Sequence, residues 1–146
     1  MNNQPILNLD GYLLSLRRLS GNLCDFWAEI FDINGDVEVG FREHLVDREI
    51  TLLDRSPVGY KEIDVVLEKH LLSKLGVEDV SLLKLFSWDI VEFIQMSFRH
   101  LDPEIDPIST KQAFLINAES GFHGQYIYIV IPVINQAIAI GLAIRA

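Results

Sequence analysis

The sequence has a single cysteine, Cys24, among its 146 residues. One thiol cannot form an internal disulfide, which excludes the disulfide-stapled folds of small secreted domains. Residues 1–12 also lack the basic flank and apolar stretch of a secretory signal. These two absences predict a cytoplasmic protein.

Basic residues are scarce as well. The chain has 12 of them against 21 acidic residues, and its formal net charge is −9. Nucleic acids and anionic membrane surfaces are themselves negatively charged, so they are disfavoured as partners. The basic residues are also dispersed, with Arg17-Arg18 as the single doublet and no aromatic platform between them. We therefore expect no nucleic-acid binding.

Catalytic and cofactor motifs of high specificity are missing. No glycine-rich phosphate loop occurs, Ser120 stands outside a GxSxG motif, and the histidines lack the spacing of a zinc helix. We therefore predict no catalytic residue, no metal ligand and no cofactor. One alternative remains open: the loop 119–125 carries His123 between glycines, a setting typical of functional loops, and would serve an enzyme or a small-molecule-binding domain. The other histidines are His44, His70 and His100.

Residues 32–43 resemble an EF-hand calcium loop. Asp32 and Asp36 stand at the first and fifth ligand positions, an asparagine at the third, and Glu43 at the twelfth. Position six, however, is Val37 instead of the glycine that lets such a loop turn, and no second EF-hand accompanies it. A β-hairpin with acidic outer positions is the favoured interpretation.

A long uncharged segment is the strongest positive signal. Residues 126–144 carry no charge, and their isoleucine and valine density favours strands over helix. Asn135-Gln136 divides the segment into two strands. A transmembrane helix is the rival interpretation, but two amides and Pro132 stand in its middle, so no membrane span is expected. With both faces apolar, the strand pair should lie centrally in a sheet, with an edge or bulge at Pro132.

Three helices are expected before this segment. Residues 10–19 have a helical apolar face, although a strand fits nearly as well. Residues 61–75 form the clearest helix, which Gly76 should terminate. Residues 79–101 are apolar on nearly all sides and predict a central, mostly buried helix that ends before Pro103 and that Ser87 could divide.

The remaining strands are predicted around turn signals. Asn34-Gly35 is a strong hairpin signal, and residues 36–41 alternate as a strand, although Leu23–Phe31 also fits a helical stripe. Residues 49–53 follow as a third strand, which Arg55-Ser56-Pro57 should break, and residues 112–118 form another. The sequence thus predicts an α+β fold: a single domain over residues 1–146 with a mostly antiparallel sheet, two central helices packed on one of its faces, and a C-terminal apolar β-hairpin.

Negative charge is concentrated in two blocks. Residues 25–49 contain eight acids against two arginines, a net of −6, and residues 86–107 contain five acids against one arginine, a net of −4. Blocks of one sign speed the encounter with an oppositely charged partner, so we predict a basic protein partner. The residues expected to contact it are Asp32, Asp36, Glu38, Glu43, Asp47, Glu49, Asp102, Glu104 and Asp106.

In its size, its acidity, its single Cys24 and its α+β pattern, the chain resembles the cytoplasmic immunity proteins of bacterial contact-dependent growth inhibition and polymorphic toxin systems. This resemblance implies a non-enzymatic inhibitor that binds a cognate toxin domain, often a nuclease, and covers its basic substrate cleft. A homo-oligomer that uses part of the apolar tail as its interface is a further alternative.

Overall fold

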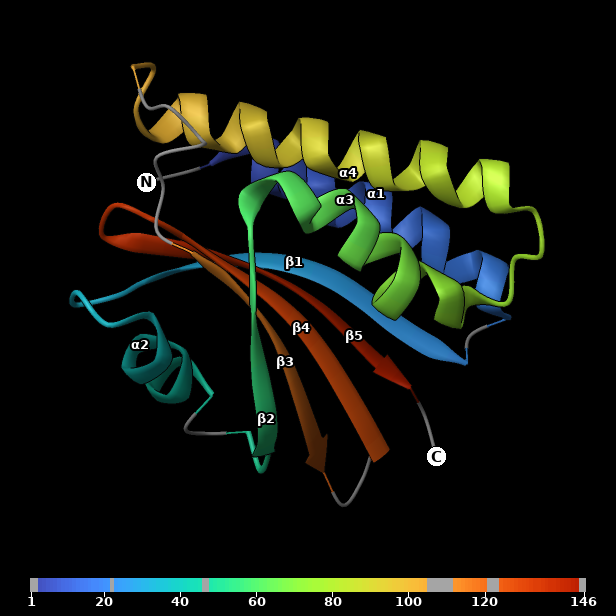
Figure 1. Ribbon diagram of the computed structural model, residues 1–146, viewed down its shortest axis with the longest axis horizontal. Helices are drawn as coiled ribbons and strands as arrows, with labels where there is room; N and C mark the ends of the chain where they lie inside the picture. Colours follow the sequence, from blue (N-terminus) through green and yellow to red (C-terminus); the bar gives the residue numbers. More distant parts are fainter. Residues whose placement is uncertain (1–2, 22, 46–47, 105–111, 121–123, 145–146) are drawn as a thin grey trace.

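The structure is a computed structural model that describes residues 3–21, 23–45, 48–104, 112–120 and 124–144. Its strands are β1 (Cys24–Asp32), β2 (Thr51–Val58), β3 (Ala113–Ser120), β4 (Gly124–Val133) and β5 (Gln136–Ile144). They form one antiparallel sheet in the order β1-β5-β4-β3-β2 (Figure 1). With the helices described next, this confirms the predicted α+β class and its antiparallel sheet.

Helices lie on both faces of the sheet. The α-helices are α1 (Gln4–Arg17), α2 (Val37–His44), α3 (Ile63–Val66) and α4 (Val80–Leu101). A 3-10 turn precedes α3, and π-type and 3-10 turns continue it to Leu75, so we refer to residues 60–75 as the α3 segment. One face of the sheet is covered by α1, the α3 segment and α4, while α2 lies on the other face (Figure 1). Coverage of one face by helices from residues 61–101 is confirmed, with α1 added to that layer.

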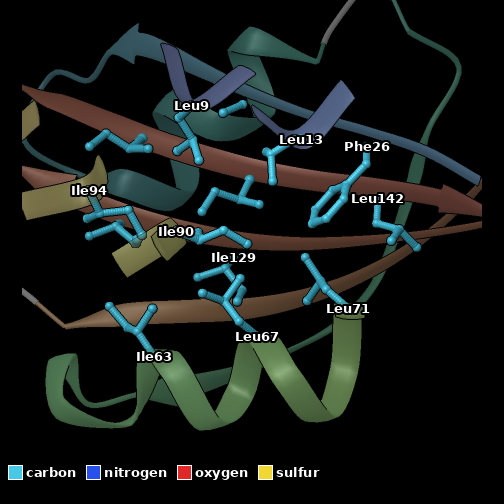
Figure 2. Packing of buried hydrophobic residues seen from close by; sticks show 14 of the residues in the cluster. Leu9, Leu13, Phe26, Ile63, Leu67, Leu71, Ile90, Ile94, Ile129 and Leu142 are labelled. Carbon is cyan, nitrogen blue, oxygen red and sulfur yellow. The ribbon is translucent and has the colours of Figure 1, made fainter. Parts of the chain in front are cut away.

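The main core lies between the sheet and the three-helix layer. Leu9 and Leu13 of α1, Leu67 and Leu71 of the α3 segment, and Ile90 and Ile94 of α4 all belong to it (Figure 2). These side chains converge on the inner face of the sheet, where Ile129 of β4 and Leu142 of β5 have no exposed surface. Burial of this many branched aliphatic side chains supplies the main favourable free energy of folding.

The C-terminal hairpin occupies the centre of the sheet, as predicted. Alternate residues of β4 and β5 point to opposite faces and nearly all are buried, so this apolar segment is not available as an oligomer interface. The last β3–β4 pair joins Phe114 to Val130, so Pro132 lies beyond that ladder. The pair that flanks the two-residue turn, Val133 with Gln136, is the hydrogen-bonded type, which points the N of Pro132 away from β5. The missing N–H therefore interrupts neither ladder, and the predicted edge position is confirmed.

The predicted hairpin around Asn34-Gly35 is wrong. Residues Leu23–Phe31 are not helical either, since β1 covers nearly all of them and pairs with β5. The chain does turn at Gly35, which has a φ of 89°, but it then enters α2 instead of a returning strand. The Asp36 side chain accepts hydrogen bonds from the N–H groups of Glu38 and Val39. This N-cap outweighs the strand-like alternation that follows it.

The third strand also differs from its prediction. β2 begins at Thr51 and continues through Arg55-Ser56-Pro57, which do not break it. β2 is the outermost strand beside β3, and an edge position tolerates a proline. The register shifts between Leu52 and Asp54, so Leu53 forms a bulge.

The predicted start of the first helix at Asp10 is wrong. α1 begins at Gln4, because the Asn3 side chain accepts a hydrogen bond from the N–H of Ile6 and Pro5 occupies the first turn. Gly21, with a φ of 65°, ends the helical segment as expected.

The long helix exists as predicted, but its expected burial is wrong. α4 runs unbroken past Ser87, from an Asp79 N-cap to Leu101, two residues before Pro103. One side of α4 is buried, while Trp88 is 56 % exposed on the other, because α4 is the outermost helix and packs on α1 and the α3 segment (Figure 1). Among the described residues, no helix has both the length and the apolar character needed to cross a membrane.

Candidate functional site

The first acidic block lies on and around α2. Asp32 ends β1, Asp36 caps α2, Glu38 and Glu43 belong to α2, and Glu49 precedes β2. All of them except Glu38 are exposed. We name the exposed set Asp32, Asp36, Glu43 and Glu49 the α2 acidic surface.

The second acidic block is separate from it. Asp102 and Glu104 follow the end of α4, on the side of the sheet opposite to α2 (Figure 1). The Asp102 carboxylate accepts a hydrogen bond from the N–H of Glu104 at 3.0 Å. The basic residues Arg99 and His100 lie in the last turn of α4, next to this block. Asp47 and Asp106, which were also predicted as contacts, lie outside the described residues. The seven predicted residues that the structure describes therefore lie on two separate surfaces.

Glu38 is engaged within the protein. One carboxylate oxygen lies 3.4 Å from Nη2 of Arg42, and the other lies 2.5 Å from Nη1 of Arg55 on β2. The Arg55 guanidinium also lies over the Phe114 ring, 5.1 Å from its centroid. The network ties α2 to the edge of the sheet, so both oxygens of the Glu38 carboxylate are engaged within the fold.

A second ionic cluster holds the other end of α2. Nε2 of His44 lies 3.0 Å from a carboxylate oxygen of Glu29 on β1, and Arg48 approaches both oxygens of the same carboxylate at 3.4 Å. The His44 ring is stacked on Phe31, with centroids 4.5 Å apart and an interplanar angle of 12°. His44 thus connects α2 to β1, and its setting is that of a structural residue.

Aromatic rings of the sheet pack beneath α2. Tyr128 of β4 is fully buried, with Phe41 of α2 edge-on at 5.0 Å and Trp27 of β1 edge-on at 5.8 Å. Burial raises the pKa of Tyr128 far above its usual range, and the positive charge of Arg48 offsets only part of this effect. Its hydroxyl makes no well-formed hydrogen bond with a described residue, and Arg48 is the polar side chain that approaches it. The ionic clusters at its two ends and the aromatic rings beneath it hold α2 against the sheet.

A groove runs between α2 and the β2–β3 edge. It encloses about 210 Å³, and both apolar and charged side chains line it. Pockets for drug-sized ligands usually begin at about 300 Å³, so this space suits one side chain of a partner better than a whole small molecule. Its lining includes Val37, Arg42, Leu52, Arg55, Phe114 and Val130.

The other candidate positions do not assemble into a site among the described residues. Residues 121–123, and His123 with them, lie outside the described part of the chain. His70 is half-buried in the α3 segment and His100 is exposed near the end of α4. The described residues hold no group of three or more side chains suited to a metal ion. The entering helix of the EF-hand interpretation is replaced by β1, and Asp36 is occupied as an N-cap.

Sequence reasoning missed the groove and its arginines. Arg55 and Phe114 stand far from α2 in the sequence, so no local pattern joins them to Glu38. The i, i+4 spacing of Glu38 and Arg42 was a visible helical signal. It was overlooked because the same residues alternate as a strand would.

The chain matches no protein-family model, no curated protein and no solved structure. The class that its own fold defines is an α+β protein with a three-helix layer on one side of an antiparallel sheet and a single short acidic helix on the other.

Proposed function

We propose that this protein is a non-enzymatic immunity protein that binds and neutralises a basic partner, a cognate toxin domain, through the α2 acidic surface. The observation that carries the proposal is the exposure of four carboxylates on and beside one helix that two ionic clusters hold in place. A rigid charged surface loses little conformational entropy when it binds.

Charge distribution favours this surface over the rest of the molecule. The chain carries a net −9, and residues 25–49 contribute −6 of it. A concentrated negative field steers a basic partner toward the surface and raises the association rate, most strongly at low salt. The groove beside α2 offers a place for one anchoring side chain of that partner.

The α2 surface is also favoured over the second acidic block. There, Asp102 is engaged with the backbone of Glu104, and Arg99 lies one turn away on α4. Asp32 and Asp36 also have internal roles, since Asp32 accepts a hydrogen bond from Gln136 at 3.1 Å and Asp36 caps α2. Glu43 and Glu49 are therefore the residues whose substitution tests binding with the least risk to the fold.

The test uses the C-terminal domain encoded by the gene directly upstream as the partner. The double variant Glu43→Lys/Glu49→Lys should keep the far-UV spectrum and melting temperature of the wild type, but bind at least about tenfold more weakly, mostly through slower association. The control Glu62→Lys/Glu78→Lys changes the net charge equally at exposed positions on the other face of the sheet and should bind like the wild type.

Cells that express the toxin domain should survive with the wild type and the control, but not with the Glu43→Lys/Glu49→Lys variant. Equal binding by both double variants would reject the α2 acidic surface. A neighbouring product with no toxicity and no affinity for the wild type would reject the immunity function itself.

A further inference from the structure

The outer side of α4 is unusually apolar for a surface helix. Trp88 and Leu85 are 56 % and 50 % exposed, and further large apolar side chains lie exposed along the same helix. Exposed apolar side chains that gather on one helix are candidates for an interaction site. The additional residues are Val80, Leu82 and Met96.

This surface carries no net charge. Lys84 and Arg99 balance Asp89 and Glu92 within α4, whereas the chain as a whole has a net charge of −9. A basic partner would find no electrostatic attraction here, so α4 does not suit the partner proposed for α2. Two copies of this acidic chain, in contrast, can bring their α4 helices together without net repulsion between the helices themselves.

The exposed side chains of α4 form a ridge with a symmetric pattern. At intervals of four residues it reads Val80, Lys84, Trp88, Glu92 and Met96, and all five are exposed. Apolar residues stand at both ends, opposite charges lie at equal distances from the centre, and the aromatic residue is the centre. Within the described part of the chain, neither Lys84 nor Glu92 takes part in an ion pair.

Such a ridge is complementary to itself. If a second copy lies antiparallel with a two-fold axis at Trp88, Lys84 of each copy lies at the same height as Glu92 of the other, within reach of its long side chain. Two-fold interfaces use the same patch on both subunits, so every contact occurs twice. Each step of four residues turns the ridge by about 40° around α4, so the contact centres on Trp88, Lys84 and Glu92 and leaves Val80 and Met96 on its flanks.

A groove beside the ridge fits the same arrangement. About 230 Å³ lie between α1 and α4, with Tyr12, Phe93 and Met96 among the lining residues. The Tyr12 hydroxyl donates a hydrogen bond to Asp89 at 2.7 Å, which fixes the wall of the groove. The groove lies on the C-terminal side of Trp88, and Leu85 lies on the N-terminal side. The two-fold axis therefore brings Leu85 of each copy to the groove of the other.

We propose that the protein forms a two-fold symmetric homodimer in which the α4 helices pair antiparallel across Trp88. The interface lies on the side of the sheet opposite to the α2 acidic surface, so the dimer displays two such surfaces on its outer sides. Each α2 remains accessible to a partner while α4 is occupied.

Sedimentation equilibrium tests the proposal directly. At concentrations up to about 100 µM, the wild type should show a species of twice the 16.6 kDa chain mass. Trp88→Asp should be monomeric. Lys84→Glu and Glu92→Lys should each be monomeric as well, because each places like charges opposite each other on both sides of the axis. Lys61→Glu, an exposed lysine outside the ridge, should remain dimeric.

Mixing the two charge variants gives the most specific test of the interface. The two single charge variants restore both opposite-charge contacts when combined, so an equimolar mixture should form a heterodimer, and the Lys84→Glu/Glu92→Lys double variant should form a homodimer. Both single variants change exposed side chains and should melt like the wild type when monomeric. A monomeric wild type at the highest concentration, a dimeric single variant, or a mixture that stays monomeric would each overturn the proposal.

Discussion

The carboxylate of Asp10, in the middle of α1, accepts a hydrogen bond from the backbone N–H of Ala28 in β1 at 3.0 Å. β1 is an edge strand of the sheet, and an edge leaves backbone groups without strand partners. Here a side chain from the neighbouring helix satisfies one of them and fixes α1 against the edge.

Removal of this acceptor should weaken the fold. We expect Asp10→Ala to lower the free energy of unfolding by about 1–3 kcal/mol, because the N–H of Ala28 loses a charged partner. Urea denaturation followed by circular dichroism measures the change. Asp10→Asn keeps an acceptor oxygen and should lose less; an Asn variant as unstable as the Ala variant would show that the hydrogen bond is not the cause.

Gly141 should not tolerate a methyl group. A Cβ at this position would lie 2.5 Å from the Trp27 ring and 2.9 Å from the Tyr128 ring. We expect Gly141→Ala to cost about 1–3 kcal/mol through overpacking, measured by thermal denaturation. When Trp27→Leu is already present, Gly141→Ala should cost less stability than it does in the wild type, since the ring that the methyl group meets has been removed.

The same substitution should have the opposite effect in α1. Gly11 is exposed within the helix, and a Cβ added there would meet no other atom within 4 Å. Gly11→Ala should therefore stabilise the protein by about 0.5–1 kcal/mol, because alanine has the higher helix propensity. A melting temperature below that of the wild type would contradict the exposed helical position of Gly11.

Ile134 is a β-branched residue in a left-handed conformation. It has a φ of 58° in the turn between β4 and β5, and its side chain is exposed. This conformation costs L-residues about 1–2 kcal/mol, and asparagine adopts it more readily. Ile134→Asn should raise the midpoint of urea denaturation without a change in slope; an unchanged or lower midpoint would argue against strain at this turn.

Tyr128 should make the protein sensitive to alkaline pH. Burial raises its pKa above the ordinary value of 10.0, so the folded state holds the phenolic proton more tightly than the unfolded state. The contribution to stability is complete below pH 10 and is lost as the pH rises above it. Tyr128→Phe should reduce this loss when unfolding is measured between neutral pH and about pH 11.

The same variant tests the unpartnered hydroxyl. Since the Tyr128 hydroxyl makes no well-formed hydrogen bond with a described residue and only Arg48 approaches it, replacement by phenylalanine should cost little at neutral pH. A loss above about 1 kcal/mol at pH 7 would point to a hydrogen-bond partner for the hydroxyl.

Sequence patterns predicted the elements that depend on local signals. The isoleucine density of β4 and β5, the apolar face of the α3 segment and the cap at Gly76 all led to the observed structure. The exposure of α4 was not predictable, because a stripe of apolar residues does not reveal whether a helix lies inside a layer or on top of it. The sequence did not predict α2, because the helix start signal is the single N-cap residue Asp36. The strand-like alternation of residues 36–41 is a longer and more visible pattern.

The site was predicted only in part. Charge counting selected Glu43 and Glu49, which are exposed on α2 and just after it. It could not separate them from Glu38, whose partner Arg55 comes from the far edge of the sheet. Long-range pairing decides which carboxylates remain available, and a single sequence does not contain that information.

The pairing of β1 with β5 also determines when the sheet can form during synthesis. Cys24 pairs with Ile144, so the first described strand meets the last one only after the ribosome has made both. β2, in turn, has no neighbour until β3 is made. A nascent chain with such long-range contacts carries an unpaired β1 until β5 has been made, which slows the formation of the sheet. For the immunity function proposed above, this delay would separate the synthesis of the protein from its protective action.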